Sequence, residues 1–318
     1  MSNIRPAHFT LSEFASQFRY HQNILSDTAR TEAISEALKK HVQAGTTVLD
    51  LGAGTGIWSV FAAKLGAEVV AVESEASLIP VMKETVRENG AADRVEVIHA
   101  DANDLALDRR FDVVLAEVFG SSSFAPETIE TIIKARRRYL AQSGVLVPSV
   151  LSMKAVLVRM DDKIGASFSH LGINTSFITS LGENFVNYPS VDVRRNLDQL
   201  SAPVTLAEID LQTAESAPHF RFETVFRSSE LSWGNAVAVY SSASYEDITL
   251  DNFYGTSWGI ELYPFAASEE ATELVFALYR ENGQQFWKVG ANDREPKTYS
   301  GIFAAMMLER KGSNFDVT

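Results

Sequence analysis

The sequence predicts an α/β protein whose first half is a parallel sheet covered by helices and whose second half is an antiparallel β-barrel or sandwich with an inserted helical arm. Strands and helices alternate up to Pro148, long alternating strands follow it, and the stretch 163–188 interrupts them with a helical or irregular pattern. Strand–helix alternation is typical of a parallel sheet with helices on both faces. We therefore expect N-terminal helices over 1–42, an α/β domain over 43–148 and a β domain over 149–318.

Hydrophobic periodicity places the elements of the first half. Ala33, Ala37 and Leu38 recur at the spacing of one helical face, whereas short apolar runs bounded by turn residues have the length of buried strands. The expected helices are Leu11–Tyr20, Ala29–Val42, Trp58–Leu65, Ala76–Asn89 and Glu127–Tyr139. The expected strands are Thr47–Leu51, Glu68–Val72, Val95–His99, Asp112–Ala116 and Gly144–Val147.

After Pro148 helical periodicity mostly ends and apolar and polar residues alternate, which favours antiparallel strands. The expected strands are Ser152–Val158, Thr205–Leu211, Phe220–Phe226, Ala236–Ser242, Gly259–Tyr263, Glu273–Tyr279 and Ile302–Leu308. The inserted stretch Lys163–Tyr188 contains more apolar residues than an isolated solvent-exposed arm would carry. It is therefore expected to pack against another surface.

Composition restricts the classes of partner. With 28 Lys and Arg against 41 Asp and Glu, the formal net charge is −13. Such acidity disfavours nucleic acid or an anionic membrane as the main partner and suits a cationic substrate, although it also serves solubility. Without cysteine, the chain has no disulfide, thiolate metal site or thiol nucleophile. No metal-binding histidine spacing, bilayer-spanning run or signal peptide is found, so a cytoplasmic protein without a metal is expected.

A glycine-rich turn after the first strand is the strongest local motif. The run Val48–Gly56 contains Gly52, Gly54 and Gly56 in the pattern GxGxG, which lets the backbone approach a ligand closely. A dinucleotide site would instead show GxGxxG, with pyrophosphate at the helix N-terminus. Asp50 would repel pyrophosphate but suits the cationic amino-acid end of S-adenosylmethionine. The motif therefore favours that cofactor on a Rossmann-like core.

Acidic and amide residues follow the next two strands. Glu73 ends the second strand, where a carboxylate can accept hydrogen bonds from both ribose hydroxyls of a nucleoside. A single acid there is otherwise simply solvated. Asp101 and Asn103 follow the third strand, where an adenine amino group would be met, although Asp and Asn also favour turns in their own right.

These motifs resemble the protein arginine methyltransferase family of class I S-adenosylmethionine-dependent enzymes, over nearly the whole chain. The family's N-terminal pattern, a histidine followed by two hydrophobic residues, an Asp and an Arg, matches His21–Arg30. The segment Ile57–Ala67 resembles the family's stretch after the glycine turn. The resemblance implies that Arg30 holds the cofactor carboxylate, with His21 beside the cofactor, and that 163–188 is an arm forming a two-fold homodimer.

The resemblance also implies two substrate-clamping carboxylates. Ala116–Gly120 resembles the start of the family's double-Glu loop, which makes Glu117 the first acid. The second acid should follow nine positions later, where this chain has Pro126, so Glu127 is the candidate and Glu130 the alternative. The loop Ser121–Phe124 is smaller and more polar than is usual in the family.

The family's Thr-His-Trp motif is here Thr256-Ser257-Trp258, so a His–Asp relay is absent. Trp258 would either form a wall of the substrate slot or be a core residue.

The function expected from these residues is N-methylation of a guanidino group, in peptides or in free arginine. Because a guanidinium keeps its proton at neutral pH, two carboxylates would bind the cation rather than deprotonate it. A biosynthetic enzyme that methylates nitrogen or oxygen of another small molecule is the alternative. A scaffold that has kept the fold without the activity is a third interpretation, disfavoured by the intact set of Arg30, Asp50, Glu73 and Glu117.

Overall fold

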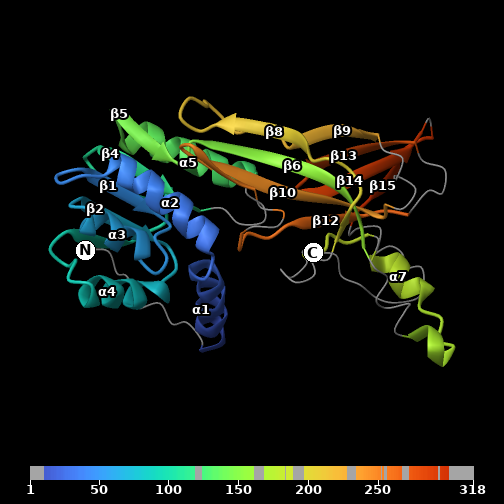
Figure 1. Cartoon of the computed structure of the whole chain (residues 1–318), viewed down its shortest axis with the longest axis horizontal. Coiled ribbons are helices and arrows are strands. Elements are labelled where there is room, and N and C mark those ends of the chain that lie inside the picture. The colour runs from blue at the N-terminus through green and yellow to red at the C-terminus, as the bar shows by residue number, and fades with distance from the viewer. Residues whose placement is uncertain are drawn as a thin grey trace. The chain divides into compact units, whose positions relative to one another are not determined.

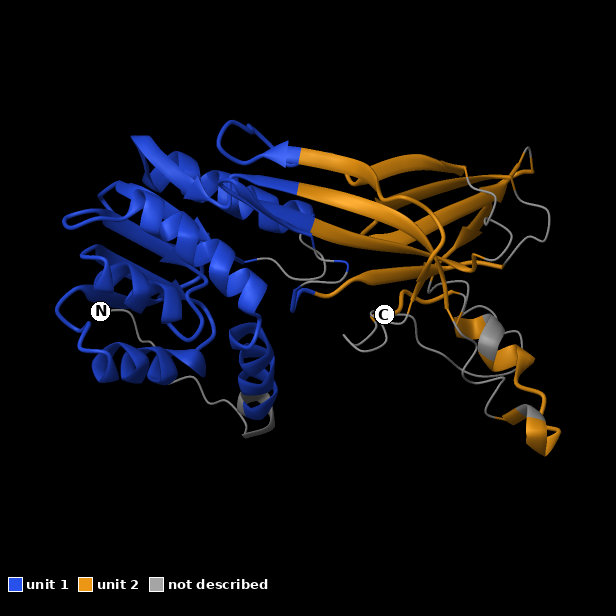
Figure 2. Cartoon of the chain, in the orientation of Figure 1, with its two compact units in different colours: residues 1–151, 209–218, 242–258 blue, residues 152–208, 219–241, 259–318 orange. Residues whose placement is uncertain are grey.

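Strands and helices alternate through the first part of the chain in the computed structural model (Figure 1). The structure describes residues 11–118, 124–160, 168–182, 184–188, 197–227, 234–251, 253, 256–266, 272–292 and 294–300. The chain divides into two compact units (Figure 2). Unit 1 comprises Met1–Leu151, Ile209–Pro218 and Ser242–Trp258, and unit 2 comprises Ser152–Glu208, His219–Ser241 and Gly259–Thr318. The domain limits expected at 42 and 148 stay a prediction.

Unit 1 is built on a parallel sheet, as predicted. Its strands are β1 (Thr47–Leu51), β2 (Glu68–Glu73), β3 (Val95–His99), β4 (Phe111–Ala116) and β5 (Leu140–Val147). They lie in the order β3-β2-β1-β4-β5, and every neighbouring pair is parallel. The chain first adds β2 and β3 on one side of β1. It then places β4 and β5 on the other side of β1, so the strand order reverses between β1 and β4. Ligands of open α/β sheets bind at such a reversal, beyond the carboxyl ends of the strands.

Helices accompany this sheet (Figure 1). They are α1 (Leu11–Leu25), α2 (Thr28–His41), α3 (Ile57–Lys64), α4 (Leu78–Glu88) and α5 (Pro126–Tyr139). Helix α2 begins where the Asp27 side chain accepts a hydrogen bond from the Arg30 backbone N–H at 3.0 Å, an N-cap contact. Its predicted apolar face is buried. Helix α1 continues to Leu25 rather than ending at Tyr20, since no helix-breaking residue comes before the Asp27 cap.

The second half forms antiparallel sheets, which confirms the predicted fold class. Its strands are β6 (Val150–Arg159), β7 (Asp198–Gln199), β8 (Val204–Asp210), β9 (Arg221–Arg227), β10 (Ala236–Tyr245), β11 (Ile248–Asp251), β12 (Glu261–Pro264), β13 (Glu273–Glu281), β14 (Gln284–Ala291) and β15 (Lys297–Tyr299). One sheet contains β11-β10-β6-β7, with β12 on β10 and β8 on β6, and the other has the order β15-β14-β13-β9. The expected strand Ile302–Leu308 lies outside the described residues.

Strand β14 was not expected from the sequence. It pairs with β13 through a two-residue turn, because Glu281 lies opposite Gln284 in the register. Asn282 and Gly283 occupy that turn with φ of 50° and 77°, the left-handed conformation that an Asn-Gly hairpin turn requires. The Asn-Gly pair is therefore the signal in the sequence that predicts this hairpin. Strands β7, β11 and β15 were also missed, since each has only two to four residues.

The described part of the predicted arm contains two short helical segments. A 3-10 turn covers Ser169–Leu171, and helix α7 covers Ser176–Gly182. Strand β5 begins at Leu140, immediately after α5, rather than at the predicted Gly144. It starts early because Leu140 already pairs with Phe111 of β4, before a register shift in the β4–β5 ladder.

Candidate active site

The candidate site lies in unit 1, where β1 and β4 end side by side. Leu51, the last residue of β1, pairs with Ala116, the last residue of β4. The glycine turn and Glu117 therefore follow two neighbouring strand ends at the point where the strand order reverses. A Cβ added at Gly52 would lie 2.6 Å from the Val118 side chain, so the two segments are in close contact.

The glycine turn is fixed to its neighbours through backbone bonds and close packing. The N–H groups of Gly52 and Ala53 both donate to the Val72 carbonyl of β2, at 2.9 and 3.0 Å. Gly54 has a φ of +57°, and a Cβ there would lie 2.7 Å from Cε1 of His21. The half-buried His21 of α1 thus covers the turn, and burial lowers the pKa of its imidazole. Only glycine fits this position without displacing His21.

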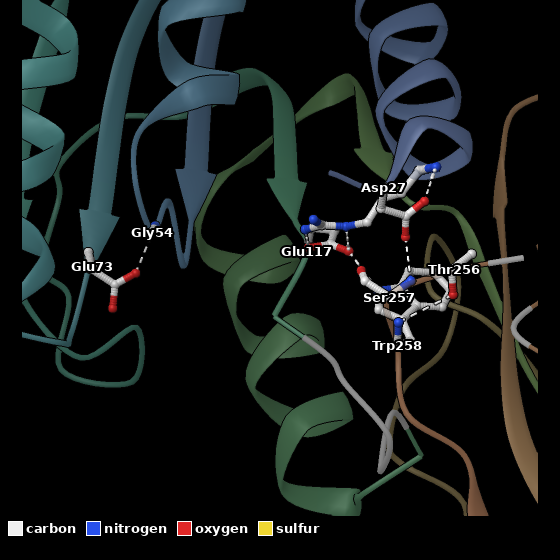
Figure 3. A network of polar contacts seen from close by, with 8 residues as sticks. Asp27, Gly54, Glu73, Glu117, Thr256, Ser257 and Trp258 are labelled. Carbon is white, nitrogen blue, oxygen red and sulfur yellow. Dashed lines mark hydrogen bonds and ion pairs between the residues drawn. The ribbon is translucent and has the colours of Figure 1, made fainter. Parts of the chain in front are cut away.

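Glu73 receives backbone donors on both carboxylate oxygens. Oε2 accepts from the Gly54 N–H at 2.8 Å, and Oε1 accepts from the Glu75 N–H at 2.7 Å. The residue is 8% exposed. Each carboxylate oxygen offers two lone pairs, so each can accept one further hydrogen bond from a ligand. Glu73 therefore both holds the glycine turn, as Figure 3 shows, and presents an acceptor beside it.

Asp50 lies beneath the turn and is directed into the protein. Its Oδ2 accepts from the Ser59 hydroxyl of α3 at 2.5 Å, and the residue is 2% exposed. Burial raises the pKa of Asp50 to about 7, with the nearby Glu73 and Glu117 carboxylates adding to the rise and the Ser59 hydroxyl opposing it. Its predicted contact with the cofactor's amino group stays a prediction.

Arg30 and Glu117 form a buried ion pair. Arg30 Nε donates to Glu117 Oε1 at 2.6 Å, and Arg30 Nη2 donates to Glu117 Oε2, so the contact is bidentate. The indole N–H of Trp258 also donates to Glu117 Oε1, at 3.1 Å (Figure 3). Both charged side chains are 8% exposed. Burial raises the pKa of the Glu117 carboxyl, against the opposing effects of Arg30 and Trp258.

Asp27 joins this cluster, although the sequence analysis did not select it. One of its oxygens caps α2 at the Arg30 N–H, and the other accepts from the Ser257 N–H (Figure 3). The segment that carries Trp258 is thereby attached to the start of the helix that carries Arg30. The position of Asp27 just before α2 is a signal in the sequence for an N-cap. Its contact with the Ser257 N–H depends on tertiary structure.

The other sequence-predicted acids lie apart from this cluster. Asp101 and Asn103 are exposed and bond to one another, with Asp101 Oδ1 accepting from the Asn103 N–H at 2.8 Å, which is a turn contact. Glu127 is exposed in the first turn of α5. Glu130 Oε1 accepts from the Ala217 N–H at 2.7 Å, so this carboxylate is already engaged.

Comparison with known proteins finds a methyltransferase domain within the chain. A family model described as a methyltransferase domain matches residues 48–144, which begins in β1 and ends within β5. A probable protein arginine N-methyltransferase 6 of Arabidopsis thaliana is 30% identical over 200 residues, covering 61% of this chain and 46% of the relative. The chain spans about half the length of the curated relatives that it matches.

Solved structures share the fold over most of the chain. The protein arginine methyltransferase 1 enzyme–prozyme complex of Trypanosoma brucei matches with a TM-score of 0.72 and 19% identity, covering 88% of this chain and 96% of that one. Protein arginine methyltransferase 10 of Arabidopsis thaliana matches with a TM-score of 0.70 and 23% identity, covering 90% and 99%. The chain therefore contains a methyltransferase domain and is similar in fold to protein arginine methyltransferases.

The described residues contain no cluster of three His, Asp or Glu side chains that could hold a metal ion. No helix in the described part of the chain is long and apolar enough to cross a membrane. Besides Asp27, two site residues were not selected from the sequence. Ser59 holds Asp50, and Tyr245 is buried within electrostatic reach of Arg30 and Glu117.

The Asp50→Asn variant is expected to be more stable than the wild type at pH 8, without ligand. The pKa of Asp50 is about 7 in the folded chain, against an ordinary value of 3.8 that the unfolded chain would show. Between these values the unfolded chain has released the proton that the folded chain retains, so stability falls as pH rises through that window. The full loss is on the order of 4 kcal/mol above pH 7.

Urea unfolding at pH 5 and pH 8 measures this effect. The stability gain of Asp50→Asn should be larger at pH 8 than at pH 5, and an equal gain at both pH values would contradict the buried-acid interpretation. Asp93→Asn, a change at an exposed carboxylate, is the control and should alter stability little at either pH.

Proposed function

We propose that the protein is an S-adenosylmethionine-dependent N-methyltransferase that acts on a guanidino group. The observation that carries the proposal is Glu117, a buried carboxylate just beyond β4 at the reversal of strand order. A buried acid at this edge of the sheet suits a cationic acceptor held beside a ligand in the glycine turn. The similarity to a probable protein arginine N-methyltransferase of Arabidopsis thaliana supports the same activity.

The residues around the glycine turn fit the cofactor. The turn lies so close to His21 and Val118 that a side chain at Gly54 or Gly52 would displace them, so glycine keeps the turn beside the end of β4. Glu73 would accept from the ribose hydroxyls, and Arg30 would hold the carboxylate. Asp50, Asp101 and Asn103 stay proposed contacts to the amino group and the adenine. The structure of the Trypanosoma brucei relative contains AdoHcy, which supports the assignment.

Arg30 links the two halves of the proposed site, because its guanidinium is paired with Glu117. A cofactor carboxylate would compete with Glu117 for the same donors. The negative charge of the Glu117 carboxylate would then be less neutralised by Arg30 and would attract the acceptor cation more strongly. We therefore propose that cofactor binding precedes and favours acceptor binding.

The chemistry assigned to the chain is positioning and electrostatic stabilisation. The bound cofactor would supply a methyl group on a sulfonium centre. Glu117 would bind the guanidinium, bring one nitrogen into line with that methyl group and draw positive charge away from that nitrogen. The nitrogen would gain the methyl group as the methyl–sulfur bond breaks and would release one proton to solvent, so the product keeps a single positive charge. Glu127, one position after the place where the family's second acid is expected, is proposed as the second acid, with Glu130 as the alternative. Trp258 orients Glu117 through its indole N–H.

Mass spectrometry of acceptors incubated with methyl-labelled S-adenosylmethionine tests the function. Arginine-rich peptides and free arginine form one arm, and matched lysine peptides and hydroxyl compounds form the other. Label on a guanidino nitrogen is the expected result, and the peptide-to-arginine ratio identifies the natural acceptor class. Label confined to another amine or to oxygen would favour a biosynthetic small-molecule enzyme instead.

We propose further that the protein is a homodimer formed through the arm. Large apolar side chains are exposed there, including Leu171 at 59%, Ile173 and Ile178 at 53% and Phe185 at 47%. Exposed apolar surface of this kind marks an interface. Light scattering at micromolar concentration should give twice the chain mass of 35.0 kDa, and the double variant Leu171→Lys and Ile178→Lys should give one chain mass. A monomeric wild type would contradict the proposal.

The cytoplasmic location expected from the sequence stays a prediction.

A further inference from the structure

Tyr245 carries a buried hydroxyl group that has no hydrogen-bond partner among the described residues. The residue, the last of β10, is 1% exposed. Buried polar groups are nearly always hydrogen-bonded, because removing a hydroxyl from water without a replacement partner is unfavourable. The group therefore points to a partner that is present only in another state of the protein.

The backbone of Tyr245 is held firmly in place. Tyr245 pairs with Ile248 of β11 and closes a two-residue turn, and the first turn residue, Glu246, has a φ of 55°. The Glu246 carboxylate bonds to Lys40 at 2.9 Å and to His41 at 2.6 Å, at the end of α2. Strand β11 also packs on α2. The hairpin is thus attached to the helix that carries Arg30.

The Tyr245 hydroxyl lies within electrostatic reach of Glu117, Arg30 and Asp27. Burial raises the pKa of Tyr245 well above its ordinary value, and the Glu117 carboxylate adds to the rise. The phenol therefore keeps its proton at physiological pH and remains a hydrogen-bond donor. Among these neighbours, the carboxylates of Glu117 and Asp27 are the groups that accept from a donor.

Glu117 is the acceptor that loses a donor under the proposed function. In the structure its oxygens accept from Arg30 twice and from Trp258 once. Asp27 accepts from the backbone N–H groups of Arg30 and Ser257, so it loses no donor when the Arg30 side chain changes partner. When a cofactor carboxylate accepts hydrogen bonds from the Arg30 guanidinium, Glu117 loses hydrogen bonds from Arg30. It then keeps the Trp258 N–H as a donor.

We propose that the Tyr245 hydroxyl donates to the Glu117 carboxylate when ligand engages Arg30, and so acts as a positioning residue that keeps Glu117 oriented and ionised for the acceptor. The inference rests on the proposed function and deepens it. During the reaction, the Tyr245 hydroxyl would replace one of the hydrogen bonds that Arg30 donates to Glu117.

The variant Tyr245→Phe removes only the hydroxyl group. Without ligand, its melting temperature should equal or exceed that of the wild type, because no hydrogen bond is lost. At saturating S-adenosylmethionine, kcat should fall by about tenfold or more, as expected when a charged group loses a hydrogen bond. The acid limb of the pH–rate profile should move to higher pH, because the ionised form of Glu117 loses a donor.

Calorimetry gives a readout that needs no turnover. S-adenosylhomocysteine is titrated into each protein in buffers of different ionisation enthalpy at pH 7, which measures proton uptake on binding. Tyr245→Phe should take up more protons than the wild type, because the pKa of Glu117 rises further in the complex. An inactive wild type would refute the proposed function alone, whereas equal proton uptake would overturn the role of Tyr245.

Tyr139→Phe is the matched control, because Tyr139 is also buried in unit 1 but its hydroxyl donates to the Leu105 carbonyl. It should lose stability while keeping the wild-type pH–rate profile and proton uptake. A loss of ligand-free stability in Tyr245→Phe comparable to that control would show a structural partner and overturn the inference. So would an unchanged kcat and pH–rate profile in an active background.

Discussion

Replacing Glu117 with glutamine is expected to lower the turnover number for a guanidino acceptor by about two to three orders of magnitude. The amide keeps the size of the side chain and most of its hydrogen bonding, but it removes the charge that would bind the acceptor cation. Losing a preorganised electrostatic group of this type costs about 2.7–4 kcal/mol of transition-state stabilisation. Steady-state kinetics with methyl-labelled S-adenosylmethionine measures the change.

The same variant should respond more strongly to ligand. Glu117→Gln leaves the buried Arg30 guanidinium without an anionic partner, which is expected to lower ligand-free stability by about 3–5 kcal/mol. The carboxylate of S-adenosylhomocysteine would give Arg30 a new partner. Its addition should therefore raise the melting temperature of Glu117→Gln by more than that of the wild type.

Glu96→Gln is the control for both measurements, since Glu96 forms an exposed ion pair with Arg109 at 2.7 Å. It should change neither turnover nor the response to ligand, because surface pairs contribute little. Full activity of Glu117→Gln, or a product methylated on oxygen, would end the guanidino proposal. A smaller ligand-induced shift than in the wild type would contradict the exchange of partners at Arg30.

Glu73→Ala is expected to weaken S-adenosylhomocysteine binding by about a hundredfold or more. Two hydrogen bonds from ribose hydroxyls to a charged acceptor would be lost, each worth about 1.5–3 kcal/mol. The alanine also releases the Gly54 and Glu75 N–H groups that Glu73 now holds, so the glycine turn loses its support. Isothermal titration calorimetry of the wild type and the variant measures the affinity.

Glu68→Ala is a matched control on the same strand. Glu68 lies at the opposite end of β2 and pairs on the surface with Arg94 at 2.8 Å. Its variant should bind with wild-type affinity. If Glu73→Ala also kept that affinity, the cofactor site would have been assigned to the wrong residues.

The first half of the fold could be predicted because its signals are local. The expected bounds of β1 and β3 match the observed Thr47–Leu51 and Val95–His99, since buried parallel strands are short apolar runs. The apolar stripe of α2 likewise identified a helix with one buried face. Strand β14 could not be recognised from composition, because Gln284–Ala291 mixes polar and apolar residues and pairing with β13 stabilises it.

The site shows the same division between local pattern and long-range contact. Sequence alone identified the glycine turn, Glu73, Arg30 and Glu117, because each follows a strand end or belongs to a spaced motif. It could not show that Arg30 and Glu117, 87 positions apart, hold one another. That contact exists because the strand order sets β4 beside β1, and because a buried charge requires an opposite partner. Asp27 and Tyr245 joined the site for the same reason: only the packed chain brings their oxygens near these charges.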